Sequence, residues 1–299
     1  MASPGLQKLI HLMRKWQQRS QVSIQAIRDG LDYMASTTPI PKDVQWEDVD
    51  AGGVPAIWVT TPGCNPEHVI LHYHGGGWIA GSAKNSREFL GRISRATKAR
   101  VISVDYRLAP EHPYPAAIED AFIAYKWLLS RDISPKHLIL LGESAGGNLV
   151  LVTLLKARNA NLPLPVAAVL LSPATDMTLT DGSFVSRVKI DPFLSPAMTR
   201  LMVGSYVPHP HLLQDPNVSP IYADLKGLPS LFIQVGTAEI LYDHSINFAA
   251  KAKKAGVQVE VDEIQDGLHA MAMFPTIIPE AAKATENIVN FIQKFFKLA

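Results

Sequence analysis

The chain has 299 residues, of which 47% are hydrophobic and 18% are charged, as in a globular protein with a large apolar core. Its 28 Lys and Arg residues almost balance its 27 Asp and Glu residues. The resulting net charge of +1 gives no electrostatic reason to expect a nucleic-acid partner or binding to an anionic membrane. Cys64 is the single cysteine, which excludes a disulfide within the chain and a cysteine-based metal cluster.

The first part of the chain predicts an amphipathic helix. Its apolar residues recur at helical spacing and are Leu6, Leu9, Ile10, Met13 and Trp16. Basic residues interrupt them, so no signal peptide is recognised and a cytoplasmic location is expected. No segment approaches the ~18 consecutive apolar residues of a transmembrane helix. Because such a stripe more often packs on its own protein than on lipid, we expect no stable membrane association.

Strand-like and helix-like segments alternate from about residue 54 onward. The apolar segments that predict strands are residues 57–60, 69–73, 101–105, 138–141, 166–172, 231–235 and 257–261. The segments that predict helices are residues 89–97, 118–129, 148–158, 245–255 and 281–296. This alternation predicts an α/β fold, in which helices cover both faces of a mostly parallel sheet. Ligands of such sheets bind beyond the carboxyl ends of the strands.

The alternation stops between about residues 181 and 220. Prolines interrupt this segment repeatedly, and only one short helical stretch is expected in it, at residues 197–206. A long, proline-rich insertion between two strands is typical of a lid over a binding site.

A triple-glycine loop, His74-Gly75-Gly76-Gly77-Trp78, follows the expected strand at residues 69–73. Consecutive glycines leave the backbone free to direct N–H groups into a cavity. An HGGG-type loop in this position supplies the donors that hold a developing oxyanion. Gly76 and Gly77 are therefore candidate donors. We expect His74 and Trp78 to shape the loop and the pocket.

The stretch Gly142-Glu143-Ser144-Ala145-Gly146 lies between an expected strand and an expected helix. A serine on such a sharp turn is the nucleophile elbow of an α/β-hydrolase. Glycines on either side let the strand and the helix approach without a Cβ clash. The sequence thus predicts Ser144 as the nucleophile, with the Ala145 N–H as a further oxyanion donor.

A serine nucleophile requires a base and an acid that orients the base, and in this fold they follow the serine in the order acid, then histidine. His269 comes after the strand expected at residues 257–261 and is the candidate base. Two carboxylates follow the strand expected at residues 231–235. Glu239 is the preferred acid. Asp243 is the alternative: it is expected to lie one turn into the next helix, where capping or a structural ion pair is the ordinary role of a carboxylate.

These motifs together resemble the bacterial hormone-sensitive-lipase family of carboxylesterases. The most specific part of the resemblance is VDYRLAPEHPYPAA at residues 104–117, which no catalytic step requires and which we interpret as a proline-rimmed turn. The family usually has an aspartate where Glu239 stands, so the chain departs from the pattern there. The resemblance implies an α/β-hydrolase fold with a helical cap that includes the N-terminal region. We expect residues 1–45 and 181–218 to form the cap and residues 46–180 and 219–299 to form the core.

The expected activity is hydrolysis of small esters with short acyl chains by a serine carboxylesterase. Ser144, His269 and Glu239 would act through an acyl-enzyme, without a metal or another cofactor. An amidase or peptidase would use the same residues. A non-catalytic small-molecule receptor on the same fold would be expected to have lost a triad member. The expected partner is a small-molecule ester, and a homodimer is possible.

Overall fold

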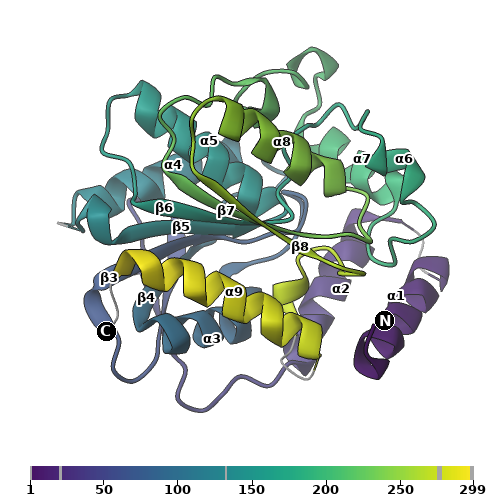
Figure 1. Ribbon diagram of the computed structural model, residues 1–299, viewed down its shortest axis with the longest axis horizontal. Helices are drawn as coiled ribbons and strands as arrows, with labels where there is room; N and C mark the ends of the chain where they lie inside the picture. Colours follow the sequence, from purple (N-terminus) through teal and green to yellow (C-terminus); the bar gives the residue numbers. More distant parts are fainter. Residues whose placement is uncertain (1, 20–21, 132, 275–277, 297–299) are drawn as a thin grey trace.

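The computed structural model describes residues 2–19, 22–131, 133–274 and 278–296. The described residues form one central sheet of eight strands in the order β1-β2-β4-β3-β5-β6-β7-β8 (Figure 1). The strands are β1 (Gln45–Asp50), β2 (Pro55–Thr60), β3 (Asn65–Tyr73), β4 (Ala99–Val104), β5 (Leu138–Glu143), β6 (Ala167–Leu171), β7 (Ser230–Gly236) and β8 (Val259–Ile264). Neighbouring strands from β4 to β8 in this order run parallel, whereas β2 pairs antiparallel with both β1 and β4.

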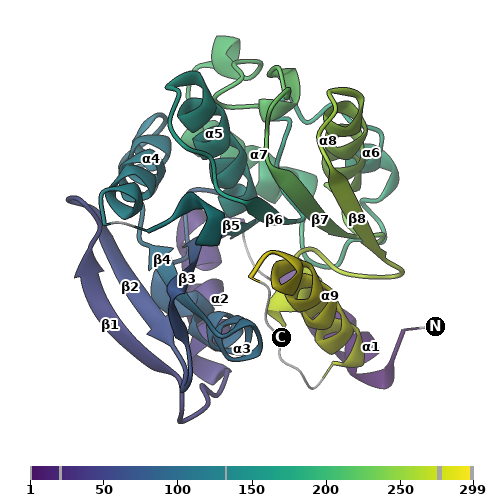
Figure 2. The same ribbon diagram turned by 60° about the vertical axis from the view of Figure 1, so that its left-hand side comes forward.

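Helices cover both faces of the sheet (Figure 2). One face carries α4 (Ala116–Leu129), α5 (Ala145–Asn159) and α8 (Tyr242–Lys254), and the other carries α3 (Arg87–Thr97) and α9 (Pro279–Phe296). Every residue of the central strand β5 is buried, as is expected for a parallel strand with helices on both sides. The predicted α/β-hydrolase class, with a mostly parallel sheet covered on both faces, is confirmed.

The sequence analysis did not anticipate β1. This strand lies at the edge of the sheet, and its side chains are almost all exposed. Its sequence, QWEDVD, therefore lacks the apolar run that identifies the buried strands.

The insertion between β6 and β7 contains α6 (Ser183–Ser186) and α7 (Pro196–Tyr206). The sequence sets the start of α7. Pro196 has no N–H group, so it suits the first turn, where N–H groups have no partner within the helix. Ser195 Oγ caps the helix by accepting a hydrogen bond from the Met198 N–H at 3.2 Å. The described residues also form five short 3₁₀ helices, which are η1 (Ala83–Ser86), η2 (Pro135–His137), η3 (Pro210–Leu212), η4 (Pro220–Tyr222) and η5 (Met271–Met273).

The N-terminal segment forms α1 (Pro4–Arg19) and α2 (Ile24–Thr37). Leu6 and Met13 of α1 are buried on the side of the sheet that carries α3 and α9, and the Ser3 N–H and hydroxyl donate hydrogen bonds to the Glu280 carboxylate at 2.7 and 2.8 Å. The side chain of Trp16, the last residue of the expected stripe, lies outside the described part. The apolar face of α1 thus packs on the protein itself.

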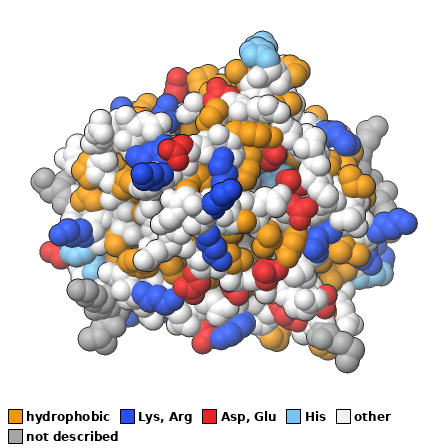
Figure 3. All heavy atoms as spheres, turned by 45° about the horizontal axis from the view of Figure 1, so that its top comes forward, with side chains coloured by type: hydrophobic (Ala, Val, Ile, Leu, Met, Phe, Trp, Pro, Cys, Tyr) orange, Lys and Arg blue, Asp and Glu red, His pale blue; other side chains and the backbone are white. Residues whose placement is uncertain are grey.

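The surface has no strongly charged face in the view of Figure 3, where basic, acidic and apolar side chains are interspersed. This agrees with the near balance of charge in the sequence. Within the described ranges, no helix combines the length and the apolar character needed to cross a membrane.

Candidate active site

Ser144 is the only residue between β5 and α5, and its backbone has φ 55° and ψ −117°. Such a conformation is strained for a residue with a side chain, and it occurs mostly where the surrounding structure enforces it. A Cβ on Gly142 would overlap the backbone of Gly146, and a Cβ on Gly146 would overlap the backbone of Tyr73 and His74 at the end of β3. The two glycines therefore allow the tight turn that presents Ser144 at the N-terminus of α5, where the helix dipole favours negative charge.

The glycine loop lies beside this serine. A Cβ built on Gly75 would be 3.4 Å from the Ser144 Cβ. Gly76 and Gly77 have φ values of +110° and +62°, which favour glycine, and a Cβ on either would overlap its neighbours. The Gly75 N–H donates a hydrogen bond to Glu143 Oε1 at 2.7 Å, so the residue before Ser144 also anchors the loop. The sequence analysis missed this role of Glu143.

His74 and Trp78 make contacts that hold the two ends of the loop. The His74 ring is buried, stacks on Tyr106 at 4.2 Å and donates from Nδ1 to the Gly75 carbonyl at 2.7 Å. Burial lowers the pKa of His74, which favours the neutral ring. Trp78 stacks on Tyr206 of α7 at 4.5 Å. Both side chains thus pack against the loop or its surroundings.

His269 and Glu239 form a buried pair. His269 Nδ1 lies 2.5 Å from Glu239 Oε2, and Glu239 is completely inaccessible to solvent. The other carboxylate oxygen, Oε1, accepts hydrogen bonds from Ser172 Oγ at 2.7 Å and from the Gly236 N–H at 2.8 Å. Both oxygens therefore have donors, as a buried carboxylate requires.

Asp243 has a different partner. Its Oδ2 accepts a hydrogen bond from the Ser183 N–H at 2.7 Å, and its own N–H donates to Ser183 Oγ at 3.0 Å. Asp243 thus joins the first turn of α8 to α6. Of the two carboxylates that follow β7, Glu239 is the one in contact with His269.

Burial and nearby charges act on the pKa of His269 in opposite directions. Burial lowers this pKa, but the negative charge and hydrogen bond of Glu239, together with the charges of Asp191 and Glu143, raise it above its ordinary value. Within the described part of the chain, no hydrogen bond joins Ser144 Oγ to His269.

The insertion contributes two residues near His269 that the sequence analysis missed. The Phe193 ring stacks on His269 with ring centroids 5.9 Å apart. Asp191 is buried and accepts hydrogen bonds from the N–H groups of Phe193, Leu194 and Ile240, while burial raises its pKa to about 6. The only signal in the sequence was Asp191-Pro192-Phe193, which reads equally well as an ordinary turn.

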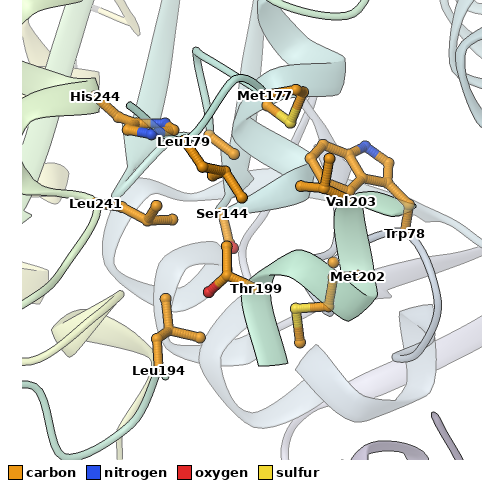
Figure 4. Close-up of a pocket in the computed structure, with 12 residues that line it drawn as sticks. Trp78, Ser144, Met177, Leu179, Leu194, Thr199, Met202, Val203, Leu241 and His244 are labelled. Atoms are coloured by element: carbon orange, nitrogen blue, oxygen red, sulfur yellow. The ribbon is translucent and has the colours of Figure 1, made fainter. Parts of the chain in front are cut away.

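A mainly apolar pocket adjoins Ser144 (Figure 4). The pocket is small and partly open to solvent. The lining residues come from the glycine loop, the elbow, the segment after β6, the insertion and α8, and they are Gly77, Trp78, Ser144, Ala174, Met177, Leu179, Leu194, Thr199, Met202, Val203, Leu241 and His244. The arrangement suits a small apolar group bound next to Ser144.

His244 lies in the wall of this pocket and differs in character from His269. Its Nδ1 accepts a hydrogen bond from the Thr175 N–H at 3.0 Å, and burial lowers its pKa to about 4, which keeps the ring neutral. His209 and His211 lie side by side with ring centroids 5.7 Å apart. Among the described residues, no group of three or more His, Cys, Asp or Glu side chains could hold a metal ion.

Comparisons with known proteins agree with this geometry. A family model for the alpha/beta hydrolase fold matches residues 70–273. An esterase of Acinetobacter venetianus is 35% identical over 266 residues, which cover 89% of this chain and 88% of the relative. A carboxylesterase of Mycobacterium tuberculosis is 33% identical over 258 residues, which cover 83% and 76%. The crystal structure of an esterase from the bacterial hormone-sensitive lipase family has a TM-score of 0.94 at 37% identity and covers 98% of this chain and 99% of that one.

Proposed function

Because the chain belongs to the bacterial hormone-sensitive-lipase family of carboxylesterases and is a carboxylic ester hydrolase, we propose that Ser144, His269 and Glu239 are its catalytic residues. The observation that carries the proposal is the 2.5 Å contact between His269 Nδ1 and the buried carboxylate of Glu239. This contact fixes the proton on Nδ1 and leaves Nε2 free to act as the base. The strained elbow at Ser144 supports the proposal independently.

In the proposed mechanism, neutral His269 removes the proton of Ser144 while the serine oxygen attacks the ester carbonyl. Glu239 stabilises the imidazolium that forms. The N–H groups of Gly76, Gly77 and Ala145 hold the oxyanion, helped by the N-terminus of α5.

His269 then donates its proton to the leaving alcohol, and an acyl-enzyme remains on Ser144. Water enters, loses a proton to the same histidine and attacks the acyl carbon. The second tetrahedral intermediate collapses and releases the carboxylic acid. Every proton passes through His269, so neither a metal nor a cofactor takes part in this scheme.

The pocket supports a preference for short acyl chains. Met202 of α7 packs directly over Gly77, and Met177 and Leu179 come from the opposite side (Figure 4). A short alkyl group can fill this space, whereas a long chain would need α7 to move. A cytoplasmic location, a homodimer and the division into cap and core remain predictions from the sequence.

The proposal is tested first at the nucleophile. Ser144→Ala should fold normally and lose roughly 10⁴-fold or more of the wild-type kcat on a p-nitrophenyl ester. An organophosphate should label Ser144 in the wild type, as read by mass spectrometry of the digested protein. Substantial turnover by a folded Ser144→Ala protein would refute the mechanism.

Substrate class is tested with p-nitrophenyl esters of increasing acyl length and with matched p-nitroanilides. We expect kcat/KM to be highest for short acyl groups and to fall as the chain outgrows the pocket. Hydrolysis of the anilides at rates similar to those of the esters would favour an amidase instead.

A further inference from the structure

Arg28 of α2 binds three groups outside the N-terminal segment. Its Nε donates a hydrogen bond to the Ile79 carbonyl at 2.7 Å, and its Nη2 donates to the Ala109 carbonyl at 3.2 Å. Its Nη1 and Nη2 also donate to the two carboxylate oxygens of Glu111, at 2.8 and 2.7 Å. The planar guanidinium can make these contacts together, whereas a lysine ammonium could not span them.

The Ile79 carbonyl lies at the end of the glycine loop. The N–H groups of Ile79 and Ala80 donate to the Gly76 carbonyl at 3.2 and 3.1 Å, which closes the loop into a tight turn. The peptide group that joins Ile79 to Ala80 therefore accepts a hydrogen bond from Arg28 through its carbonyl and donates one to the Gly76 carbonyl through its N–H. Arg28 thus holds, from outside the pocket, the turn that carries the N–H groups of Gly76 and Gly77.

The turn within residues 104–117 completes this support. The Ala109 N–H donates to the Trp78 carbonyl at 2.8 Å, so the successive carbonyls of Trp78 and Ile79 are held by Ala109 and Arg28. Glu111, two residues later, orients the guanidinium. These contacts give the turn no catalytic role of its own. They connect it structurally to the loop beside Ser144.

The Arg28–Glu111 ion pair is too exposed to contribute much to stability. The side chains are 25% and 54% exposed, and ion pairs at such positions add little because water and salt screen them. The hydrogen bond from Arg28 is the main reason why the pKa of Glu111 is lowered to about 2, so the pair stays charged through the neutral range. The contacts of Arg28 with backbone carbonyls therefore matter more than the charge pair alone.

We propose that Arg28 is a positioning residue that fixes the oxyanion loop from α2, through the carbonyls of Ile79 and Ala109. The inference rests on the proposed role of Gly76 and Gly77 as oxyanion donors. If it holds, α2 contributes to catalysis from outside the pocket, because it sets the geometry of the donors that face the charge developing on the substrate oxygen.

The test uses the full chain with Arg28→Met, which keeps an apolar stem and removes every donor. We expect kcat on a short p-nitrophenyl ester to fall about 10-fold to 100-fold, because displaced donors stabilise the transition state less well. KM should change by less than about twofold, since the pocket side chains are untouched. The affinity for a short alkyl trifluoromethyl ketone, which forms an oxyanion on Ser144, should fall in parallel with kcat.

Three variants serve as comparisons. Arg28→Lys keeps the charge without the fork, so its kcat should also fall. Glu111→Gln keeps an acceptor for the guanidinium, so its loss should be smaller than that of Arg28→Met. Arg95→Met is the matched control: Arg95 forms a similarly exposed ion pair with Asp43 and does not contact the glycine loop, so its kcat should be normal.

Wild-type kcat and ketone affinity in folded Arg28→Met would overturn the inference and leave Arg28 as a simple tether. If Arg28→Met does not fold, Arg28→Lys decides: a reduced kcat with normal KM supports the inference, and wild-type kinetics overturn it. Organophosphate labelling of wild-type Ser144 separates the two proposals. Failure of labelling would refute the catalytic proposal and with it this inference, whereas normal labelling with unchanged Arg28 variants would refute this inference alone.

Discussion

Glu239→Gln gives the sharpest test of the proposed triad, because the surrounding donors dictate how the new amide must lie. In the wild type, Glu239 Oε1 accepts a hydrogen bond from the Gly236 N–H, and Oε2 contacts His269 Nδ1. The Gly236 N–H cannot reverse its direction, so the glutamine carbonyl oxygen should occupy the Oε1 position. The amide NH₂ group then faces His269 and requires Nδ1 to become the acceptor.

This arrangement puts the proton of His269 on Nε2, which is the wrong tautomer for a general base. It also removes the negative charge that stabilises the imidazolium. The equivalent change in a serine-protease triad costs about 10⁴ in kcat, or about 5.4 kcal/mol of transition-state free energy. We expect a loss of this order in Glu239→Gln, with KM little changed and with the hydrogen bond from Gly236 preserved.

The assay is steady-state hydrolysis of a short p-nitrophenyl ester, with thermal unfolding as the check on folding. Asp243→Asn is the matched control, because an asparagine oxygen can still accept the hydrogen bond from the Ser183 N–H. Its kcat should stay close to that of the wild type. A large loss of kcat in Asp243→Asn, together with nearly wild-type kcat in Glu239→Gln, would show that the assignment of the acid is wrong.

Other predictions concern the base, the glycine loop and the insertion. In the proposed mechanism only neutral His269 can act as the base, and its pKa is raised, so kcat/KM should rise with pH around a midpoint above the reference value of about 6.5. In Glu239→Gln this midpoint should move to lower pH, because the negative charge that raises the pKa is removed. A midpoint that does not move would contradict the charge argument. Gly77→Ala should lose most activity because its φ of +62° disfavours a side chain and its Cβ would overlap Met202. Adding Met202→Ala should restore only part of this activity, because it relieves most of the overlap and leaves the backbone strain. Wild-type kinetics of Gly77→Ala would refute the role of the loop. Asp191→Ala leaves three backbone N–H groups without their acceptor, so we expect the free energy of unfolding, measured with urea, to fall by about 2–4 kcal/mol. An unchanged urea midpoint would refute this account.

Local sequence was sufficient for the features that depend on short-range geometry. A buried strand, a serine between small residues and an apolar helix define the elbow at Ser144, because the sharp turn tolerates few other residues. The alternation of strands and helices likewise predicted the α/β class. The same reasoning missed β1, since an exposed edge strand has no apolar pattern to recognise.

Tertiary structure decided which side chains meet across distant segments. Glu239 and Asp243 are both carboxylates in one short stretch after β7, and sequence could only rank them. The turn directs Glu239 inward to His269, while α8 directs Asp243 to Ser183. Asp191 accepts a hydrogen bond from the N–H of Ile240, which lies 49 residues away in the chain. Arg28 donates a hydrogen bond to the carbonyl of Ile79, which lies 51 residues away. Such contacts depend on the directions in which packed elements hold their side chains, and no local pattern of residues records those directions.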